Sequence, residues 1–212
     1  MLGQPSKTLV DPTYFVRVEV CGGMASGKTT FVNLTKRLRF NRLLEKFRNN
    51  PFWEAFHLDP FKYAFETEIS FILQHYHQIK RKEVNSKINI CDFSLFLDLA
   101  YAEVGLQGTK LEGFHTIYEE IKRDLSPPAL LIYLKCDAKT ELQRVRKRGR
   151  APEKFVTLEF LEKLNKAVEQ QVAKISGKTK VLSIDSAQRN FVKDEAVKQE
   201  LMDLVSKTLQ RI

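Results

Sequence analysis

No run of about 18 apolar residues free of charged side chains occurs in this 212-residue chain, so the sequence holds no candidate membrane-spanning helix. The first twelve residues also lack a basic segment followed by an apolar run, which is the pattern of a secretory signal peptide. We therefore expect no membrane partner and a cytoplasmic location. A short transit peptide is the open alternative, although this stretch is poor in arginine.

Cysteine is scarce, and its spacing excludes the common metal sites. The three cysteines are Cys21, Cys91 and Cys136. Each lies in or at the end of a predicted strand, and none is paired at the short spacing of a zinc site, so buried thiols in a reducing compartment are expected. The histidines in the middle of the chain likewise lack an E-x-x-H or similar partner pattern.

Acidic residues are outnumbered, with 26 acidic against 35 basic residues and a formal net charge of +9. This balance favours an anionic partner, either a nucleotide or a nucleic acid. No RNA- or DNA-binding motif appears, so we expect a small molecule rather than a nucleic acid. The length fits one α/β domain over residues 1–212, with a core of useful size.

Residues 22–29 read G-G-M-A-S-G-K-T, a complete G-x-x-x-x-G-K-[ST] phosphate-binding loop. In such a loop backbone N–H groups surround phosphate oxygens, Lys28 reaches the terminal phosphates and the Thr29 hydroxyl contacts Mg²⁺. A strand-like run precedes the loop and a helical pattern follows it, which an ordinary glycine-rich turn does not require. The loop residues predicted to bind a nucleoside triphosphate are Gly22, Gly23, Met24, Ala25, Ser26, Gly27, Lys28, Thr29 and Thr30.

Strand-like runs alternate with helical stretches along the whole chain, which predicts a parallel sheet flanked by helices. The predicted strands are 14–21, 42–47, 88–93, 129–136 and 181–185, and the predicted helices are 28–39, 62–81, 94–105, 114–124, 138–148, 157–175 and 193–210. Ligands of such sheets bind at the carboxyl ends of the strands.

Two carboxylates are predicted at those strand ends. Glu45, late in the second strand, could take the proton from a hydroxyl that attacks a γ-phosphate; the alternative is an ordinary surface glutamate. Asp92, at the end of the third strand, could help to hold Mg²⁺ directly or through water. Its alternative role is to cap the next helix, although Ser94 also caps well.

Arginines recur from Arg144 to Arg150, and a glutamate follows at Glu153. Arg144 and Arg148 share one helix face, and forked guanidinium groups suit a phosphoryl group in transfer. We predict an arginine-rich lid over about residues 144–154. A solvated basic helix end and a nucleic-acid patch are the alternatives.

Two further segments give weaker signals. The loop at 188–191 could present Asn190 and Phe191 to a nucleobase. The aromatic residues between 51 and 76 recur at helical spacing, so most are expected in the core, with one or two rings facing a substrate.

Together these segments resemble the deoxynucleoside kinase family, especially its bacterial deoxyadenosine/deoxyguanosine kinase branch, from about residue 15 to 204. The resemblance rests on segments that begin at Glu45 (E-K-F-R-N-N-P), Lys62 (K-Y-A-F), Asp92 (D-F-S), Leu95 (L-F-L-D), Arg144 (the lid, to Glu153) and Phe160 (F-L-E-K-L-N). It implies a P-loop NTPase fold, and transfer of the γ-phosphoryl group of ATP, with Mg²⁺, to the 5′-hydroxyl of a nucleoside. By analogy it also implies a homodimer.

The resemblance implies a role for individual residues. Glu45 would be the general base, and Lys28, Arg144 and Arg148 would be catalytic at the phosphates. Asp92 with Thr29 would lie on the magnesium side. Asp98 would face the nucleobase and Glu153 would reach the sugar. The lid arginines that would contact ATP are Arg144, Arg148 and Arg150.

The acceptor side departs from the family pattern at four positions. His57 replaces a tyrosine, Glu68 a base-reading glutamine, His75 an arginine, and Phe93 the arginine of the [DE]-R-S segment. The predicted acceptor-binding residues are Glu45, His57, Glu68, His75, Phe93, Asp98 and Glu153. An ionised Glu68 is acceptor-only, which predicts a changed base preference. Two alternatives stay open: a kinase of another small alcohol or of a nucleotide, and a non-catalytic nucleotide-binding or assembly protein of the same fold.

Overall fold

The structure, a computed structural model, describes residues 16–81 and 88–211 and contains one five-stranded, fully parallel sheet. Its strands are β1 (Val16–Cys21), β2 (Asn41–Leu43), β3 (Ile88–Cys91), β4 (Leu130–Lys135) and β5 (Lys180–Asp185). They lie in the order β2-β3-β1-β4-β5. Central β1 places Val18 beside Ile90 of β3 on one side and Leu130 of β4 on the other. The predicted fold class is therefore confirmed.

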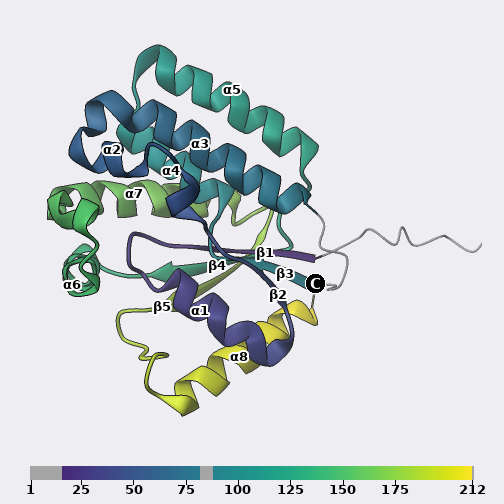
Figure 1. The fold of residues 1–212 in the computed structure, drawn as a ribbon. Coiled ribbons are helices and arrows are strands. Elements are labelled where there is room, and N and C mark those ends of the chain that lie inside the picture. The colour runs from purple at the N-terminus through teal and green to yellow at the C-terminus, as the bar shows by residue number, and fades with distance from the viewer. Residues whose placement is uncertain (1–15, 82–87, 212) are drawn as a thin grey trace, which may run out of the picture.

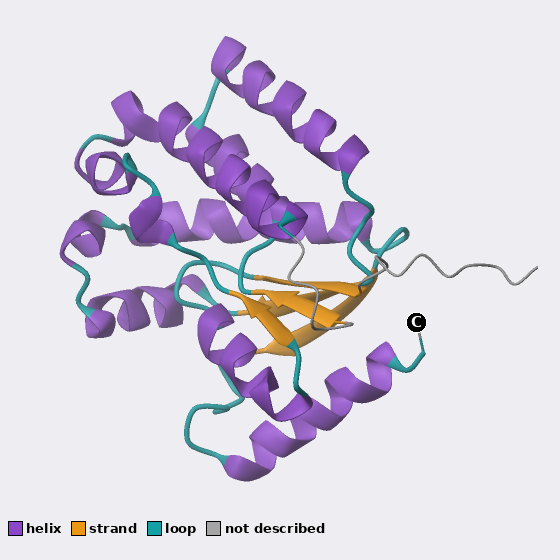
Figure 2. Ribbon diagram, turned by 45° about the vertical axis from the view of Figure 1, so that its right-hand side comes forward, coloured by secondary structure: helices purple, strands orange, loops and turns teal. Residues whose placement is uncertain are grey.

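Helices cover both faces of the sheet (Figures 1 and 2). They are α1 (Lys28–Leu34), α2 (Trp53–Leu58), α3 (Pro60–Lys80), α4 (Leu95–Gly105), α5 (Gly108–Asp124), α6 (Ala138–Arg148), α7 (Leu158–Ile175) and α8 (Glu195–Leu209). Short 3-10 turns cover Thr35–Leu38, Phe47–Asn49 and Ala151–Phe155. Among the described residues, no helix is long and apolar enough to cross a membrane.

The two faces of the sheet bury separate apolar clusters. On the side of α1 and α8, Phe31 and Leu201 pack with the fully buried strand residues Val18 and Val20. The opposite side is covered by α3, α4, α5 and α7, which lie above the sheet in Figure 1. All three cysteines are buried and unpaired, as predicted. This arrangement leaves the carboxyl ends of the strands free to build a site.

Several element boundaries differ from the prediction. Strand β2 ends at Leu43, so Glu45 lies in the connection beyond the strand and not within it. The first helix becomes a 3-10 turn after Leu34, and α2 was not predicted at all. The fifth helix begins at Gly108, six residues before its predicted start. The first two residues of the first predicted strand lie outside the described residues.

A buried ion pair fixes α4 against β1. The guanidinium of Arg17 donates from Nε to Glu19 Oε1 at 2.9 Å, and both side chains are buried. The second oxygen of Glu19 accepts from the Ser94 hydroxyl at 2.9 Å. Ser94 also caps α4, since its Oγ accepts from the N–H of Phe96. The segment between β3 and α4, which includes Asp92, is therefore held at both ends.

Candidate active site

The loop between β1 and α1 forms a compact turn around the side chain of Lys28. Gly22 and Gly27 adopt φ values of +147° and +102°, which residues with a side chain rarely adopt. The Lys28 ammonium donates to the carbonyls of Gly22 and Gly23 at 3.0 and 2.9 Å. Burial lowers the pKa of Lys28, while the charges of nearby carboxylates act in the opposite direction. The loop thus holds a cation where phosphate oxygens are predicted to bind.

Gly23 is close to two side chains that support the loop from α6 and α7. A Cβ atom there would lie 2.2 Å from Glu141 Oε1 and 2.3 Å from Asn165 Oδ1, so a larger residue at this position would require these side chains to shift. Glu141 is fully buried and accepts from Asn165 Nδ2 at 3.0 Å. Burial raises the pKa of Glu141 to about 8. Glu141 was not singled out from the sequence, and Asn165 appeared only as the end of the segment that begins at Phe160, because their meeting depends on helix packing.

Asp92 connects the phosphate loop to Glu45. Its carboxylate accepts from the backbone N–H of Glu45 and from the Thr29 hydroxyl. Burial raises the pKa of Asp92, and these two hydrogen bonds act against that shift. Because Ser94 caps α4, Asp92 does not have the capping role that was its alternative.

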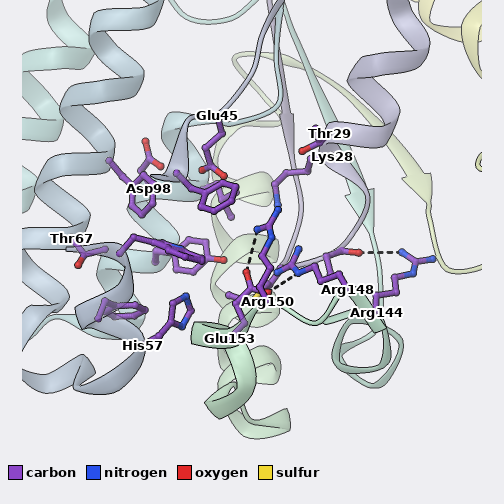
Figure 3. A pocket seen from close by; sticks show the side chains of 18 of the residues that line it. Lys28, Thr29, Glu45, His57, Thr67, Asp98, Arg144, Arg148, Arg150 and Glu153 are labelled. Carbon is purple, nitrogen blue, oxygen red and sulfur yellow. Dashed lines mark hydrogen bonds and ion pairs between the residues drawn. The ribbon is translucent and has the colours of Figure 1, made fainter. Parts of the chain in front are cut away.

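One cavity of about 440 Å³ joins the loop to an aromatic wall (Figure 3). Its lining includes Lys28, Thr29, Glu45, Glu68 and Asp98. The wall consists of Phe47, Trp53, Phe56, Thr67, Phe71, Leu97 and Tyr101, of which one or two aromatic rings between residues 51 and 76 had been expected to face a substrate and the others had not. The spacing of Thr67, Glu68 and Phe71 on α3 was the available signal, since residues three or four apart share a helix face.

Acidic side chains gather on the α3–α4 side of this cavity. Glu68 and Asp98 are each 5% exposed, and the Glu45 side chain is about one-third exposed. Burial raises the pKa of Glu68 well above its usual range, and the charge of Asp98 adds to this effect. Burial also raises the pKa of Glu45, but the interaction with His75 and the charge of Lys28 outweigh it, so the net pKa is lowered.

The lid forms a hydrogen-bonded structure around Glu153. Its buried carboxylate accepts from Arg148 Nε at 2.6 Å and from Arg150 Nη1 at 3.2 Å. The guanidinium of Arg150 also lies 4.2 Å from the ring centroid of Phe47. No individual role was predicted for Arg146. Its side chain connects α6 to the 3-10 turn by donating to the carbonyls of Glu153, Lys154 and Val156. These contacts connect the residues of the lid to one another and to α6.

Arg144 approaches the phosphate loop from α6. Its Nη1 lies 3.4 Å from the carbonyl oxygens of Ala25 and Ser26, and its Nη2 donates to the Ser186 carbonyl at 2.7 Å. Arg144, Arg148 and Arg150 all line the cavity. The cavity beside the loop is therefore lined by three arginine side chains.

Comparison with known proteins identifies the class of enzyme to which this arrangement belongs. Residues 18–210 match the family described as "Deoxynucleoside kinase". The chain belongs to the deoxynucleoside kinase family. It is therefore a phosphotransferase with an alcohol acceptor that phosphorylates deoxynucleosides with ATP.

Individual relatives agree with this family assignment. The chain is 27% identical over 186 residues to deoxyguanosine kinase of Bacillus subtilis (strain 168), covering 84% of this chain and 89% of that protein. A structure of deoxyadenosine kinase from M. mycoides with bound dCTP has a TM-score of 0.78 at 22% identity, over 93% of this chain and all of that one. The same enzyme with bound dATP has a TM-score of 0.75 at 22% identity, over 92% and 100%. At these identities the two structures support the fold alone.

Eight residues that were predicted for the deoxynucleoside kinase site do not line the cavity: Gly22, Gly23, Ser26, His75, Asp92, Phe93, Asn190 and Phe191. His75 and Phe93 are buried behind its wall, 2% and 1% exposed. Phe191 is buried, and its ring approaches Gly27 and the ring of Phe31. The side chain of Asn190 accepts from the N–H of Lys193. His57, by contrast, lies in the lining and contacts the ring of Trp53 edge-on.

Proposed function

We propose that this kinase transfers the γ-phosphoryl group of Mg-ATP to the 5′-hydroxyl of a deoxynucleoside, with Glu45 as the general base. One observation carries the proposal: Lys28, Glu45 and Arg148 line one cavity whose far wall is aromatic. A donor phosphate at the loop and a nucleoside at the wall would then meet beside Glu45. The whole chain, residues 1–212, is proposed to act as one kinase domain.

On the donor side, the loop residues Gly22–Thr30 supply backbone N–H groups to the phosphates, and Lys28 supplies a positive charge. The lid residues Arg144, Arg148 and Arg150 are proposed to stabilise the charge that spreads over the oxygens of the transferring group. Phe191 and Asn190 would act on ATP binding indirectly, through the phosphate loop. The ring of Phe191 lies against Gly27 of that loop.

Mg²⁺ fits the oxygen pair formed by the Thr29 hydroxyl and the Asp92 carboxylate. This ion commonly keeps several waters and takes one or two protein ligands besides the phosphates. The ion would neutralise charge on the β- and γ-phosphates.

On the acceptor side, the base would lie against the aromatic wall, with Glu68 and Asp98 at its edge and Glu153 near the sugar. Glu45 would remove the proton of the 5′-hydroxyl as the oxygen attacks, because its lowered pKa keeps it ionised at neutral pH. His57 would contact the acceptor from the lining. His75 and Phe93 would act from behind the wall.

A kinase assay with Mg-ATP and the four common deoxynucleosides tests the proposal, with deoxyguanosine and deoxyadenosine, the acceptors named for the relatives, tried first. The matched control is a 2′,5′-dideoxynucleoside, which lacks the reacting hydroxyl. We expect a 5′-monophosphate from at least one deoxynucleoside and no product from the control. A product phosphorylated at the 3′ position, or no transfer to any of the four, would refute the acceptor assignment. The homodimer expected from the resemblance is tested by light scattering on the same preparation.

A further inference from the structure

His75, in the middle of α3, lies between two carboxylates that come from distant parts of the chain. Its Nδ1 is 2.8 and 3.0 Å from the two carboxylate oxygens of Asp98. Its Nε2 is 3.5 Å from Glu45 Oε1, which is an ion-pair contact, and this buried nitrogen forms no hydrogen bond among the described residues. The imidazole therefore links the side chain expected at the nucleobase to the proposed general base.

The two carboxylates determine the protonation state of the ring. A neutral imidazole has one N–H and one lone pair, so either tautomer would direct a lone pair at a carboxylate. The doubly protonated ring directs an N–H at each carboxylate. Burial lowers the pKa of His75, but the charge and hydrogen bond of Asp98 and the interaction with Glu45 outweigh it and raise the pKa to about 10.

The aromatic surroundings prevent the ring from turning. Its plane is 5° from that of Phe93, with ring centroids 4.0 Å apart, and Phe71 lies 5.8 Å away at 27°. A cation over an aromatic face is attracted to it, more strongly when water is excluded. Since His75 is 2% exposed, the charge is both fixed in direction and poorly screened.

We propose that the His75 imidazolium is a positioning residue for phosphoryl transfer: it holds Glu45 in the ionised, correctly aimed state by pointing Nε2–H at Oε1. The inference rests on the proposed function, because it assumes that Glu45 is the base. Lys28 and Arg150 also act on Glu45. Both, however, are placed to contact phosphate groups, whereas His75 remains behind the wall throughout the reaction.

A double-mutant cycle between His75 and Glu45 tests this inference. His75→Asn keeps a donor for Asp98 but removes the charge and the group facing Glu45. We expect kcat to fall about 10- to 100-fold, with a much smaller change in KM for the acceptor. In the Glu45→Gln background the same substitution should cost less than threefold in kcat, because its route of action has been removed.

The possible failures are distinguishable. If Glu45→Gln alone keeps parental turnover, Glu45 is not the base, and the proposed mechanism and this inference both fail. If Glu45→Gln lowers turnover but His75→Asn costs the same factor in both backgrounds, only the inference fails. His75→Arg, a planar cation able to stack on Phe93, should keep kcat within about tenfold of the parent. A loss equal to that of His75→Asn would contradict the role of charge.

A spectroscopic measurement on the unaltered protein avoids any effect of substitution on folding. In a ¹⁵N spectrum of the four histidine rings at pH 8, one ring should show the shifts of an imidazolium, and this signal should vanish in His75→Asn. Free histidine is neutral at that pH. Finding all four rings neutral would overturn the inference.

Discussion

Gly23 faces Glu141 so closely that a methyl group on Gly23 would lie 2.2 Å from the Glu141 carboxyl oxygen. The first turn of the phosphate loop therefore rests directly on a buried acid of α6. A glycine in a loop is often required by a positive φ, but the constraint on Gly23 is steric, because its φ is not positive.

Gly23→Ala should disturb the loop, because the added Cβ would lie 2.2 Å from Glu141 Oε1 and 2.3 Å from Asn165 Oδ1, so the loop or these side chains must shift. We expect the free energy of unfolding to drop by roughly 1–3 kcal/mol and nucleotide affinity to fall at least tenfold. Gly177→Ala is the matched control, since a Cβ there meets open space. Calorimetric titration with ATP measures the effect, and parental affinity in Gly23→Ala would contradict the close contact.

Lys28→Ala removes the ammonium that now bonds the carbonyls of Gly22 and Gly23. During the reaction the attraction between the Lys28 ammonium and the transferring phosphoryl group would become stronger, because negative charge develops on that group. Turnover should therefore fall about a hundredfold or more, in line with the loss of one preorganised donor. Lys36→Ala, on an exposed turn, should behave like the parent. An unchanged rate in Lys28→Ala would mean that this loop is not the catalytic phosphate site.

The base preference should depend on pH through Glu68. Its pKa is raised by burial and by Asp98, so below that pKa the neutral acid offers one donor and one acceptor. Above it the carboxylate offers acceptors only. Raising the pH should therefore shift the ratio of kcat/KM values toward guanine, whose N1–H and N2–H₂ groups are adjacent donors, and away from adenine and cytosine.

Glu68→Gln provides the matched variant for that measurement, since the amide keeps a donor and an acceptor at every pH. Its base preference should be independent of pH and should favour adenine or cytosine over guanine by about tenfold or more. The ratios are measured by competition between pairs of deoxynucleosides. A pH-dependent ratio that survives in Glu68→Gln would exclude this residue as the source.

The sequence predicted those parts of the fold that repeat a local pattern. Helix α6 was predicted at its observed bounds, because Asp137 caps it and Gly149, in the left-handed region, ends it. The prediction for β2 was wrong in length, since Phe47 leaves the sheet and packs on Trp53 with ring centroids 4.7 Å apart. Helix α2, at six residues, is too short to show a period.

The candidate site also has parts that the sequence predicted and parts that it did not. The phosphate loop and the lid were predicted because each is a contiguous motif. The meeting of His75 with Glu45 was not predicted, since thirty positions separate the two residues and their contact depends on how α3 packs against the β2 connection. The contact of Glu141 with Gly23 has the same character. Neither helix packing nor side-chain direction can be derived from the spacing of residues within one helix.

Turnover of Glu45→Gln tests the proposed chemistry most directly. The amide keeps the volume of the side chain and removes its ability to accept a proton, so kcat for deoxynucleoside phosphorylation should fall ~10²–10⁴-fold. ATP affinity, measured by calorimetric titration, should stay within threefold of the parent. Glu54→Gln, exposed on α2, is the matched control and should retain full activity. Parental turnover in Glu45→Gln, with the control also active, would contradict the assignment of Glu45 as the base.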